Sequence, residues 1–195
     1  MPRIGVLALQ GDVAEHRSML RAAGGEAIDV KKEDELRDLD GLIIPGGEST
    51  TIGKLLRRFE MLEPLRERVR EGLPVYGTCA GMILLANRIL DAAEDQPSIG
   101  GMDISVQRNA FGRQRESFET DLAVPAIGQR PLHAVFIRAP VICDVGSEVQ
   151  VLARLPDDRP VAARQDHLLV SSFHPELSGD DRFHRYFIEM ARSQA

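Results

Sequence analysis

The chain has 195 residues, of which 43% are hydrophobic and 28% charged, and its formal net charge is −6. This length fits one domain with an adequate core, so residues 1–195 are expected to form a single domain. The acidic balance, without a basic patch, argues against nucleic acid as a partner. The absence of a long apolar run argues against a membrane-spanning helix.

The two cysteines, Cys79 and Cys143, are too few for a disulfide framework. Residues 1–4 lead directly into a predicted strand and show no signal-peptide pattern. A cytoplasmic location is therefore expected, because a reducing compartment keeps a reactive thiol intact.

The first part of the chain alternates between strands and helices. Residues 4–9 are continuously apolar, which is typical of a buried parallel strand, and a helix ending at Gly24-Gly25 follows. Further strands are predicted at 26–30 and 41–44, with a charged connection or short helix over 31–39 between them. The alternation predicts an α/β fold with a doubly wound, mostly parallel, flavodoxin-like sheet. Such sheets bind ligands at the carboxyl ends of their strands.

The third strand runs into Pro45-Gly46-Gly47-Glu48-Ser49-Thr50-Thr51. Two glycines in this place allow the backbone to approach a ligand closely, and Ser49 or Thr50 is expected to cap a helix that begins near Ile52. A glycine turn followed by an ordinary helix cap explains the segment equally well. A P-loop is excluded because no Gly-Lys-Ser/Thr follows.

A cysteine segment, Gly77-Thr78-Cys79-Ala80-Gly81, lies between a strand at 75–76 and an apolar helix expected over 82–90. Gly-x-Cys-x-Gly is typical of a nucleophile elbow, with glycines where a Cβ would collide with the backbone. The helix N-terminus would favour a thiolate on Cys79, and the amide of Ala80 would face an oxyanion. A buried structural cysteine remains the alternative for this stretch taken alone.

A nucleophilic cysteine needs a histidine as base and a group that orients it. His174 follows an apolar strand, and Pro175 forces it into an extended conformation. In an extended segment His174 and Glu176 project to the same side, so Glu176 can hold the imidazole tautomer. An ordinary proline turn is the alternative, and the cysteine elbow favours the triad. His16 and His184 lie in helical patterns and are interpreted as surface or packing residues.

The remaining histidines, His133 and His167, lie at strand starts, and only Asp166 provides a carboxylate in a useful register. No His, Cys and Asp cluster has zinc-ligand spacing, so no metal is predicted. A helix before Gly72 is expected to start at Pro64, and residues 91–97 read as an acidic surface connection.

The second half indicates a mostly antiparallel extension of the same domain. Turns separate short strand-like runs, and a final helix after residues 178–180 carries an apolar stripe. The predicted strands lie at 104–107, 118–124, 132–137, 148–155, 161–164 and 168–173. The stripe consists of Phe183, Tyr186, Phe187 and Met190.

Together, the Pro-Gly-Gly loop, the cysteine elbow and the His-Pro-Glu segment resemble the class I, triad-type glutamine amidotransferase family. Nearly the whole chain is similar to the branch of this family that forms the glutaminase subunits of pyridoxal 5′-phosphate synthases. Gly-Glu-Ser-Thr-Thr at 47–51 and Arg-Asn-Ala-Phe-Gly-Arg-Gln at 108–114 are specific to that branch. The other similar segments are 5–11, 42–46, 77–81, 135–140, 162–165 and 172–177. Residues 91–102 read longer than the usual connection.

The resemblance implies that Cys79 attacks the carboxamide of L-glutamine, forming a γ-glutamyl thioester and releasing ammonia. His174 would transfer the protons, Glu176 would orient His174, and the amides of Gly47 and Ala80 would form the oxyanion hole. The resemblance also assigns residues to the glutamine site, with Arg108 on the α-carboxylate, and requires no cofactor. The implied glutamine-site residues are Gly47, Glu48, Ser49, Arg108, Ile137 and Arg138, with Gln10 in the pocket or at an interface.

The chain ends soon after Glu176 without a synthase domain, so the ammonia is expected to be used by a separate subunit. The resemblance implies a (β/α)8-barrel pyridoxal 5′-phosphate synthase subunit, docked in a hetero-oligomer that activates the glutaminase. Three alternatives stay open: a glutaminase subunit of another synthase, such as that for imidazole glycerol phosphate; a catalytically silent binding module; and a cysteine peptidase with a related elbow.

Overall fold

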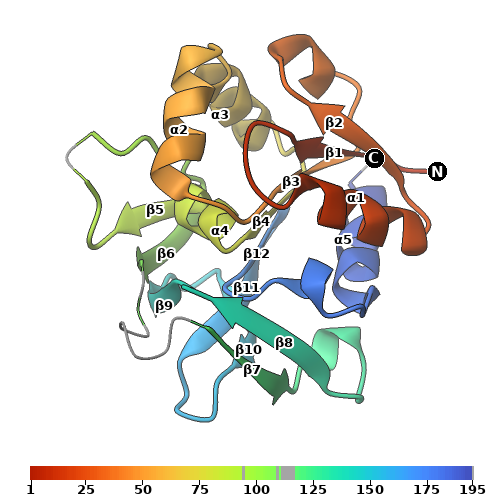
Figure 1. Ribbon diagram of the computed structural model, residues 1–195, viewed down its shortest axis with the longest axis vertical. Coiled ribbons are helices and arrows are strands. Elements are labelled where there is room, and N and C mark those ends of the chain that lie inside the picture. The colour runs from red at the N-terminus through yellow and green to blue at the C-terminus, as the bar shows by residue number, and fades with distance from the viewer. Residues whose placement is uncertain (94, 109, 111–116, 195) are drawn as a thin grey trace.

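The computed structural model describes residues 1–93, 95–108, 110 and 117–194. Its centre is a seven-stranded sheet with the strand order β10-β11-β12-β4-β3-β1-β2 (Figure 1). β2, β1, β3, β4 and β12 pair in parallel, while β10 and β11 extend the sheet antiparallel. The strands are β1 (Arg3–Leu7), β2 (Glu26–Val30), β3 (Gly41–Ile44), β4 (Val75–Thr78), β10 (Gln150–Arg154), β11 (Pro160–Gln165) and β12 (Leu168–Ser171).

Two smaller sheets complete the strands. β5 (Ala86–Ile89) pairs in parallel with β6 (Met102–Gln107), and β9 (Val141–Val145) pairs antiparallel with β6. β7 (Ser117–Leu122) and β8 (Leu132–Ile137) form an antiparallel pair. The rings of Phe118 and Phe136 stack across this pair with their centroids 4.5 Å apart.

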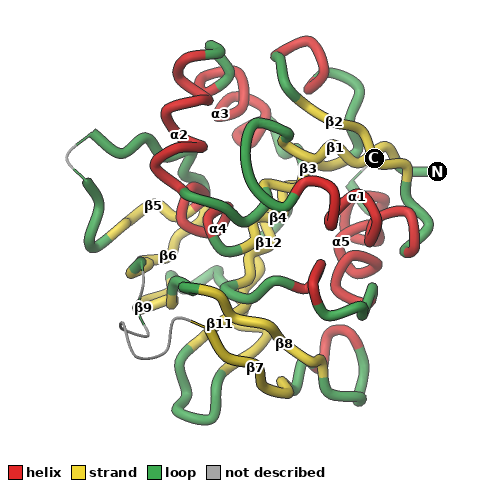
Figure 2. The backbone as a smooth tube through the Cα atoms, viewed as in Figure 1, coloured by secondary structure: helices red, strands yellow, loops and turns green. Residues whose placement is uncertain are grey.

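Helices cover both faces of the central sheet, as Figure 2 shows in red. One core cluster lies between the sheet and α2, α3 and α4, and the other between the sheet and α1, α5 and the β7–β8 pair. The alternation of side chains along each strand produces the two clusters. The helices are α1 (Val13–Ala22), α2 (Ser49–Arg58), α3 (Leu62–Arg70), α4 (Ala80–Leu85) and α5 (Arg182–Arg192), with short 3-10 turns η1 (Glu33–Leu36), η2 (Pro125–Ile127) and η3 (Pro175–Leu177).

The predicted doubly wound α/β fold with an antiparallel extension is confirmed. From β1 the chain builds toward β2 on one side and toward β3 and β4 on the other, so the strand order reverses between β1 and β3. Strands β2, β3 and β8 have the predicted bounds. Among the described residues, no helix is both long and apolar enough to span a bilayer.

Several local predictions were wrong. The helix expected over 82–90 is α4, which ends at Leu85, and Ala86–Ile89 is β5 instead. The α4 part of this run is buried at every position, and a short apolar run of this kind fits either a helix or a strand, so periodicity did not mark where α4 ends. Strand β9 was missed, and α3 begins two residues before Pro64. The cap of α2 is Glu48, not Ser49 or Thr50, so that helix starts at Ser49 rather than near Ile52.

Candidate active site

A cavity of about 370 Å³ opens at the carboxyl ends of the parallel strands. The segments that follow β1, β3, β4 and β12 meet there, and the end of β8 closes one side. Open α/β sheets bind ligands in this position, beside the reversal of strand order. The cavity is lined by Gln10, Asp12, Gly47, Glu48, Ser49, Cys79, Ile83, Arg108, Ile137, Arg138 and His174.

Cys79 occupies a sharp turn between β4 and α4. Its backbone has φ +48° and ψ −102°, a conformation that L-residues rarely adopt. Both glycines of the motif are required: a Cβ on Gly77 would lie 2.5 Å from the carbonyl carbon of Gly81, and one on Gly81 would collide with the carbonyl oxygen of Ile44. The amide of Cys79 donates to Ser171 O at 2.8 Å, which fixes the turn to the end of β12. The predicted elbow is therefore present.

His174 and Glu176 form the expected pair. His174 Nδ1 lies 2.7 Å from Glu176 Oε1, and the Glu176 side chain is fully buried. The segment is not extended as predicted, since Pro175–Leu177 is a 3-10 turn. The amide of His174 donates to Val135 O at 2.8 Å, so β8 holds the base in place. The contact between the two side chains thus forms through a turn rather than a strand.

A second carboxylate, that of Asp12, lies 3.3 Å from His174 Nδ1. The side chain of Asp12 does not cap α1, although this residue is at the cap position. A Cβ added at Gly46 would lie 2.9 Å from Asp12 Oδ2 and would collide with the ring of His174. The Gly46 backbone therefore packs directly against the base, and only glycine leaves the required space.

Electrostatics around His174 favour an imidazolium. Burial acts to lower the pKa of His174, but the side chains of Asp12, Cys79 and Glu176 outweigh it and raise this pKa to about 12. Burial raises the pKa of Glu176 above its usual value, and the hydrogen bond from His174 opposes that shift. His174 Nε2 is buried and makes no hydrogen bond of ordinary geometry to a described residue. That nitrogen is free to exchange a proton with a reacting group.

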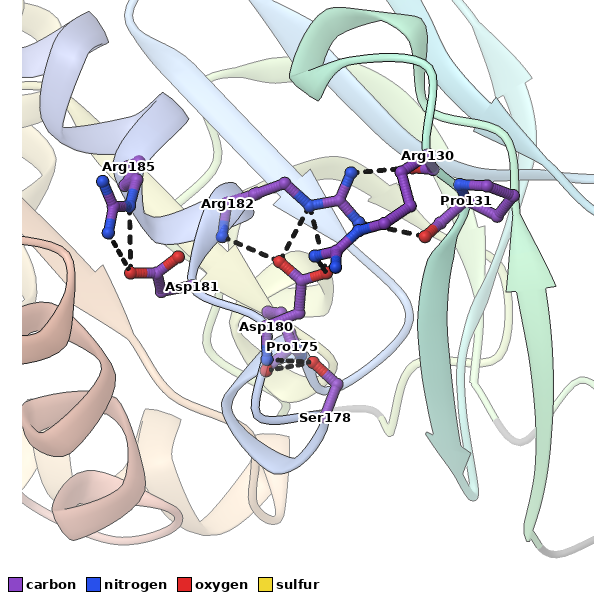
Figure 3. Close-up of polar contacts among 8 residues, drawn as sticks. All are labelled: Arg130, Pro131, Pro175, Ser178, Asp180, Asp181, Arg182 and Arg185. Atoms are coloured by element: carbon purple, nitrogen blue, oxygen red, sulfur yellow. Dashed lines mark hydrogen bonds and ion pairs between the residues drawn. The ribbon is translucent and has the colours of Figure 1, made fainter.

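A polar network anchors the turn that carries the pair (Figure 3). The Arg182 guanidinium donates to Asp180 Oδ2 at 2.6 Å and to the carbonyls of Arg130 and Pro131 at 2.7 and 2.9 Å. Ser178 Oγ donates to Pro175 O at 2.8 Å and accepts from the amide of Asp180. These contacts join η3, the start of α5 and the start of β8, so the turn that carries His174 and Glu176 is tied to two neighbouring elements.

The glycine loop at 45–48 is held by two side chains, Gln10 from the segment after β1 and Glu48 at the start of α2. Gln10 Oε1 accepts from the amide of Glu48 at 2.9 Å, and the Glu48 carboxylate accepts from the amides of Thr50 and Thr51 at 3.0 and 2.7 Å. Burial acts to raise the pKa of Glu48, but these hydrogen bonds outweigh it and lower that pKa. Gly47 has φ +155°, and a Cβ there would lie 2.5 Å from Gln10 Oε1. Glu48 therefore orders the loop and caps α2.

Two arginines line the cavity. Arg108 donates to Gln96 Oε1 at 2.9 Å, to Asp91 O at 3.0 Å and to Thr50 Oγ1 at 3.3 Å. The Arg138 backbone has φ +41°, and no hydrogen bond or ion pair joins its side chain to a described residue. Cationic groups on this side suit a ligand carboxylate. Arg108 begins the motif at 108–114. Of the other motif positions, the structure describes only Ala110, and residues 109 and 111–114 lie outside the described residues.

Sequence reasoning did not identify four residues near the site. Asp12 lies beside the base, Gln96 links Arg108 to Ser49, and His16 and His184 are buried below Glu176. Asp12 could have been recognised because it closely follows the first predicted strand. His16 shares the buried face of its helix with Met19 and Leu20, so the sequence alone marks it as a packing residue.

Asp12, His174 and Glu176 also have ligand atoms within 4.8 Å of one another, a grouping that could hold a metal ion. Sequence spacing did not reveal it because Asp12 is distant along the chain. His174 Nδ1 already bonds to Glu176 in this grouping. His133 also has carboxylate partners that spacing did not reveal, namely Glu119 and Asp121 on the exposed β7–β8 pair.

Fold and site together define a class: a doubly wound α/β protein in which a thiol and an imidazole line one cavity and a buried carboxylate contacts the imidazole, a combination of groups that covalent catalysis uses. Comparison with known families identifies the member of this class. The model of the SNO glutamine amidotransferase family matches residues 6–193, and the chain belongs to that family.

Similar proteins agree over almost the whole length. A protein of Parafrankia sp. (strain EAN1pec) named "Pyridoxal 5′-phosphate synthase subunit PdxT" is 62% identical over 193 residues, which cover 99% of this chain and 95% of that one. A protein of the same name from Kineococcus radiotolerans is 58% identical over 199 residues, covering 99% and 96%. A crystal structure described as a glutamine amidotransferase is 54% identical, with a TM-score of 0.91 and coverage of 97% and 98%.

Proposed function

We propose that this chain, as one glutaminase domain, hydrolyses L-glutamine to L-glutamate and ammonia and supplies the ammonia to a pyridoxal 5′-phosphate synthase. The observation that carries this proposal is the meeting of Cys79, His174 and Glu176 beside one cavity, in a member of a glutamine amidotransferase family. Relatives of full length that are named as synthase subunits support the assignment to vitamin B6 synthesis.

In the first half-reaction, His174 takes the thiol proton of Cys79, and the sulfur attacks the carboxamide carbon of glutamine. The C–N bond breaks, His174 delivers a proton to the leaving nitrogen, and a γ-glutamyl thioester and ammonia result. In the second half-reaction, His174 takes a proton from water, the oxygen attacks the thioester, and glutamate leaves with the thiol restored. Glu176 holds the ring so that Nε2 faces the reacting atoms.

The oxyanion formed in both steps is assigned to the amides of Ala80 and Gly47. Ala80 directly follows the nucleophile, as the second donor of an elbow does in related chemistry. Each such donor is worth about 3 kcal/mol of transition-state stabilisation. Gly47 belongs to a loop whose neighbour is tied to Gln10, and a peptide flip next to glycine is conformationally cheap.

We assign the α-carboxylate of glutamine to Arg108, and we assign Arg138 and Ile137, which line the same cavity, to the pocket that holds the rest of the substrate. Gly47 and Ser49 also line the cavity. The carboxylate of Glu48 is occupied by the start of α2, so its contribution is the order of the loop rather than a direct contact with the α-ammonium. No metal or cofactor takes part in this mechanism.

The ammonia acceptor is proposed to be a separate (β/α)8-barrel synthase subunit, joined to this chain in a hetero-oligomer in the cytoplasm. Docking would fix the orientation of the Gly46–Gly47 peptide. Gln10, which binds the next amide in the loop, would stabilise that orientation, and glutamine hydrolysis would be coupled to synthesis. Equal glutaminase rates with and without the barrel subunit would contradict this control.

A diazo-ketone analogue of glutamine provides the direct test. The chain, with the barrel subunit present, is incubated with the analogue, and the adduct is located by intact mass and peptide mapping. Modification of Cys79 that L-glutamine prevents is the expected result, while the exposed Cys143 serves as an internal control for non-specific alkylation. An unmodified Cys79 would favour a catalytically silent module.

A second measurement distinguishes the synthases that use such glutaminases. Glutamate release is followed after adding, one at a time, barrel subunits for pyridoxal 5′-phosphate and for imidazole glycerol phosphate. We expect stimulation by the pyridoxal 5′-phosphate subunit alone. Stimulation by the imidazole glycerol phosphate subunit alone would show that this chain serves that other synthase.

A further inference from the structure

A buried pair of histidines lies directly behind the candidate triad. His16, on α1, and His184, on α5, are both fully buried, and His16 Nδ1 lies 3.0 Å from His184 Nε2. On its other side, His16 Nε2 lies 3.1 Å from Thr78 Oγ1 and 3.4 Å from Glu176 Oε2. One imidazole therefore contacts both the triad carboxylate and the residue that precedes the nucleophile.

Both rings of the pair are neutral at physiological pH. Burial, together with unfavourable electrostatic interactions that a charged His16 would have with the His184 and His174 rings, holds the pKa of His16 well below its usual value. Burial lowers the pKa of His184 to about 4. A neutral imidazole has one N–H and one lone pair, so each ring must donate from one nitrogen and accept at the other.

The surroundings decide which nitrogen carries the proton. If His16 carried it on Nδ1, its Nε2 lone pair would face the carboxylate oxygen of Glu176, and His184 would be left with a buried Nδ1–H. His184 Nδ1 has no hydrogen-bond partner among the described residues, and an orphaned buried donor costs more than an unused lone pair. The other assignment avoids both penalties: His184 Nε2–H donates to His16 Nδ1, and His16 Nε2–H points toward Thr78 and Glu176.

We propose that His16 is a positioning residue of the active site, whose Nε2–H holds the second carboxylate oxygen of Glu176, with His184 fixing its tautomer. Glu176 Oε1 already binds His174, while Oε2 is buried and makes no hydrogen bond to a described residue, so His16 Nε2, at 3.4 Å, is the donor in position to approach it. Leaving a carboxylate oxygen without a donor in this place is costly. The N–H of His16 therefore prevents rotation of the carboxylate away from His174.

The arrangement also explains why an apolar residue does not occupy this position. A leucine or phenylalanine at 16 would fill space between α1 and η3 but would expose Oε2 to an apolar surface. The contact with Thr78 gives His16 a second effect, because the residue after Thr78 is the nucleophile. His16 thus ties the turn that carries the base to the turn that carries the thiol.

Two amide substitutions separate positioning from packing. In His16→Gln the side-chain amide nitrogen reaches about as far as Nε2, so a donor toward Glu176 is kept. In His16→Asn the amide reaches only as far as Nδ1, so contact with His184 is kept and the donor toward Glu176 is lost. We expect kcat for glutamine to fall roughly 10- to 100-fold in His16→Asn, the range for a hydrogen bond to a charged group, and about threefold or less in His16→Gln, with KM nearly unchanged in both.

A matched control removes the partner ring. His184→Leu removes a buried imidazole, and its loss of packing is similar to that in the His16 variants. Because the contact of His16 with Glu176 is kept, kcat should fall less than in His16→Asn. Thermal melts of all variants report the folded fraction. Equal losses in His16→Gln and His16→Asn, or a loss that resides in KM, would overturn the positioning role.

This inference rests on the proposed function, so a second measurement is independent of glutamine. Alkylation of Cys79 by iodoacetamide is followed by mass spectrometry in the same variants, with the exposed Cys143 as reference. We expect slower reaction of Cys79 in His16→Asn than in His16→Gln, and unchanged reaction of Cys143. If the wild-type complex releases no glutamate, the proposed function fails, whereas equal Cys79 reactivity in both variants refutes the role of His16 alone.

Discussion

Replacing Glu176 by glutamine tests how the carboxylate acts, because it changes charge with almost no change of shape. The carboxylate has two buried oxygens. One lies 2.7 Å from His174 Nδ1, and the other 3.4 Å from His16 Nε2. Glutamine offers one oxygen and one NH2 group, so only one of two N–H donors can find an acceptor. Whichever way the amide turns, a donor then faces a donor.

The expected cost follows from these contacts. A hydrogen bond to a charged group contributes about 1.5–3 kcal/mol, and about 1.4 kcal/mol corresponds to a tenfold change in rate. Loss of one such bond at the base therefore predicts a decrease in kcat of roughly 10- to 150-fold for Glu176→Gln. The fold should persist, since the side chain keeps its volume.

The assay measures glutamate release by the complex with the barrel subunit, with ammonia-dependent synthesis as a control for assembly. We expect the first to fall and the second to remain. A Glu176→Gln complex that retains at least a third of wild-type kcat would show that neither oxygen orients the base, and the reasoning from the two donors would be refuted.

Three further outcomes are expected. Cys79→Ala should abolish use of glutamine and leave ammonia-dependent synthesis intact; loss of both would contradict the division of labour between subunits. Arg182→Leu removes a largely buried guanidinium and its bonds to Asp180 and two carbonyls, so urea unfolding should show a loss of about 1–3 kcal/mol. The exposed Arg185→Leu should cost much less, and equal losses would refute the anchoring role of the network. Because the pKa of His174 rises from 6.5 to about 12 on folding, its stabilisation is complete below pH 6.5 and is lost as pH rises toward 12. Wild type should therefore lose more stability than His174→Gln when unfolding is compared between mildly acidic and mildly alkaline pH, and equal losses would exclude the raised pKa.

The alternation of the first strands and helices was sufficient to predict the doubly wound sheet. The rule that ligands bind at carboxyl ends of parallel strands then placed together the segments that follow the predicted strands ending at residues 44, 76 and 173. Cys79 and His174 could be paired on this basis, because each directly follows a strand. What the sequence lacked was distance information, so Asp12, which follows the first strand closely, was not recognised as a neighbour of His174.

The missed elements have a common physical cause. Residues 82–85, the last part of α4, are all apolar, and nothing in the periodicity marks Leu85 as the end of the helix. Similarly, His16 lies at helical spacing with Met19 and Leu20, and such a position reads as packing unless the polar group it faces is known. That group, Glu176, comes from the far end of the chain. Partners of this kind are set by tertiary contacts, which local patterns do not record.

The hydrogen bonds of Arg108 have a consequence for ligand affinity. Its guanidinium is already shared among Gln96, the Asp91 carbonyl and Thr50, so an incoming carboxylate must compete with acceptors that are tethered to the same chain. The apparent dissociation constant then depends on the strength of the bonds from Arg108 to Asp91 and Gln96, and not only on the contacts made by the ligand. Changes in the length of the connection at 91–97, remote from the reacting sulfur, would tune substrate saturation while leaving the chemical steps as they are.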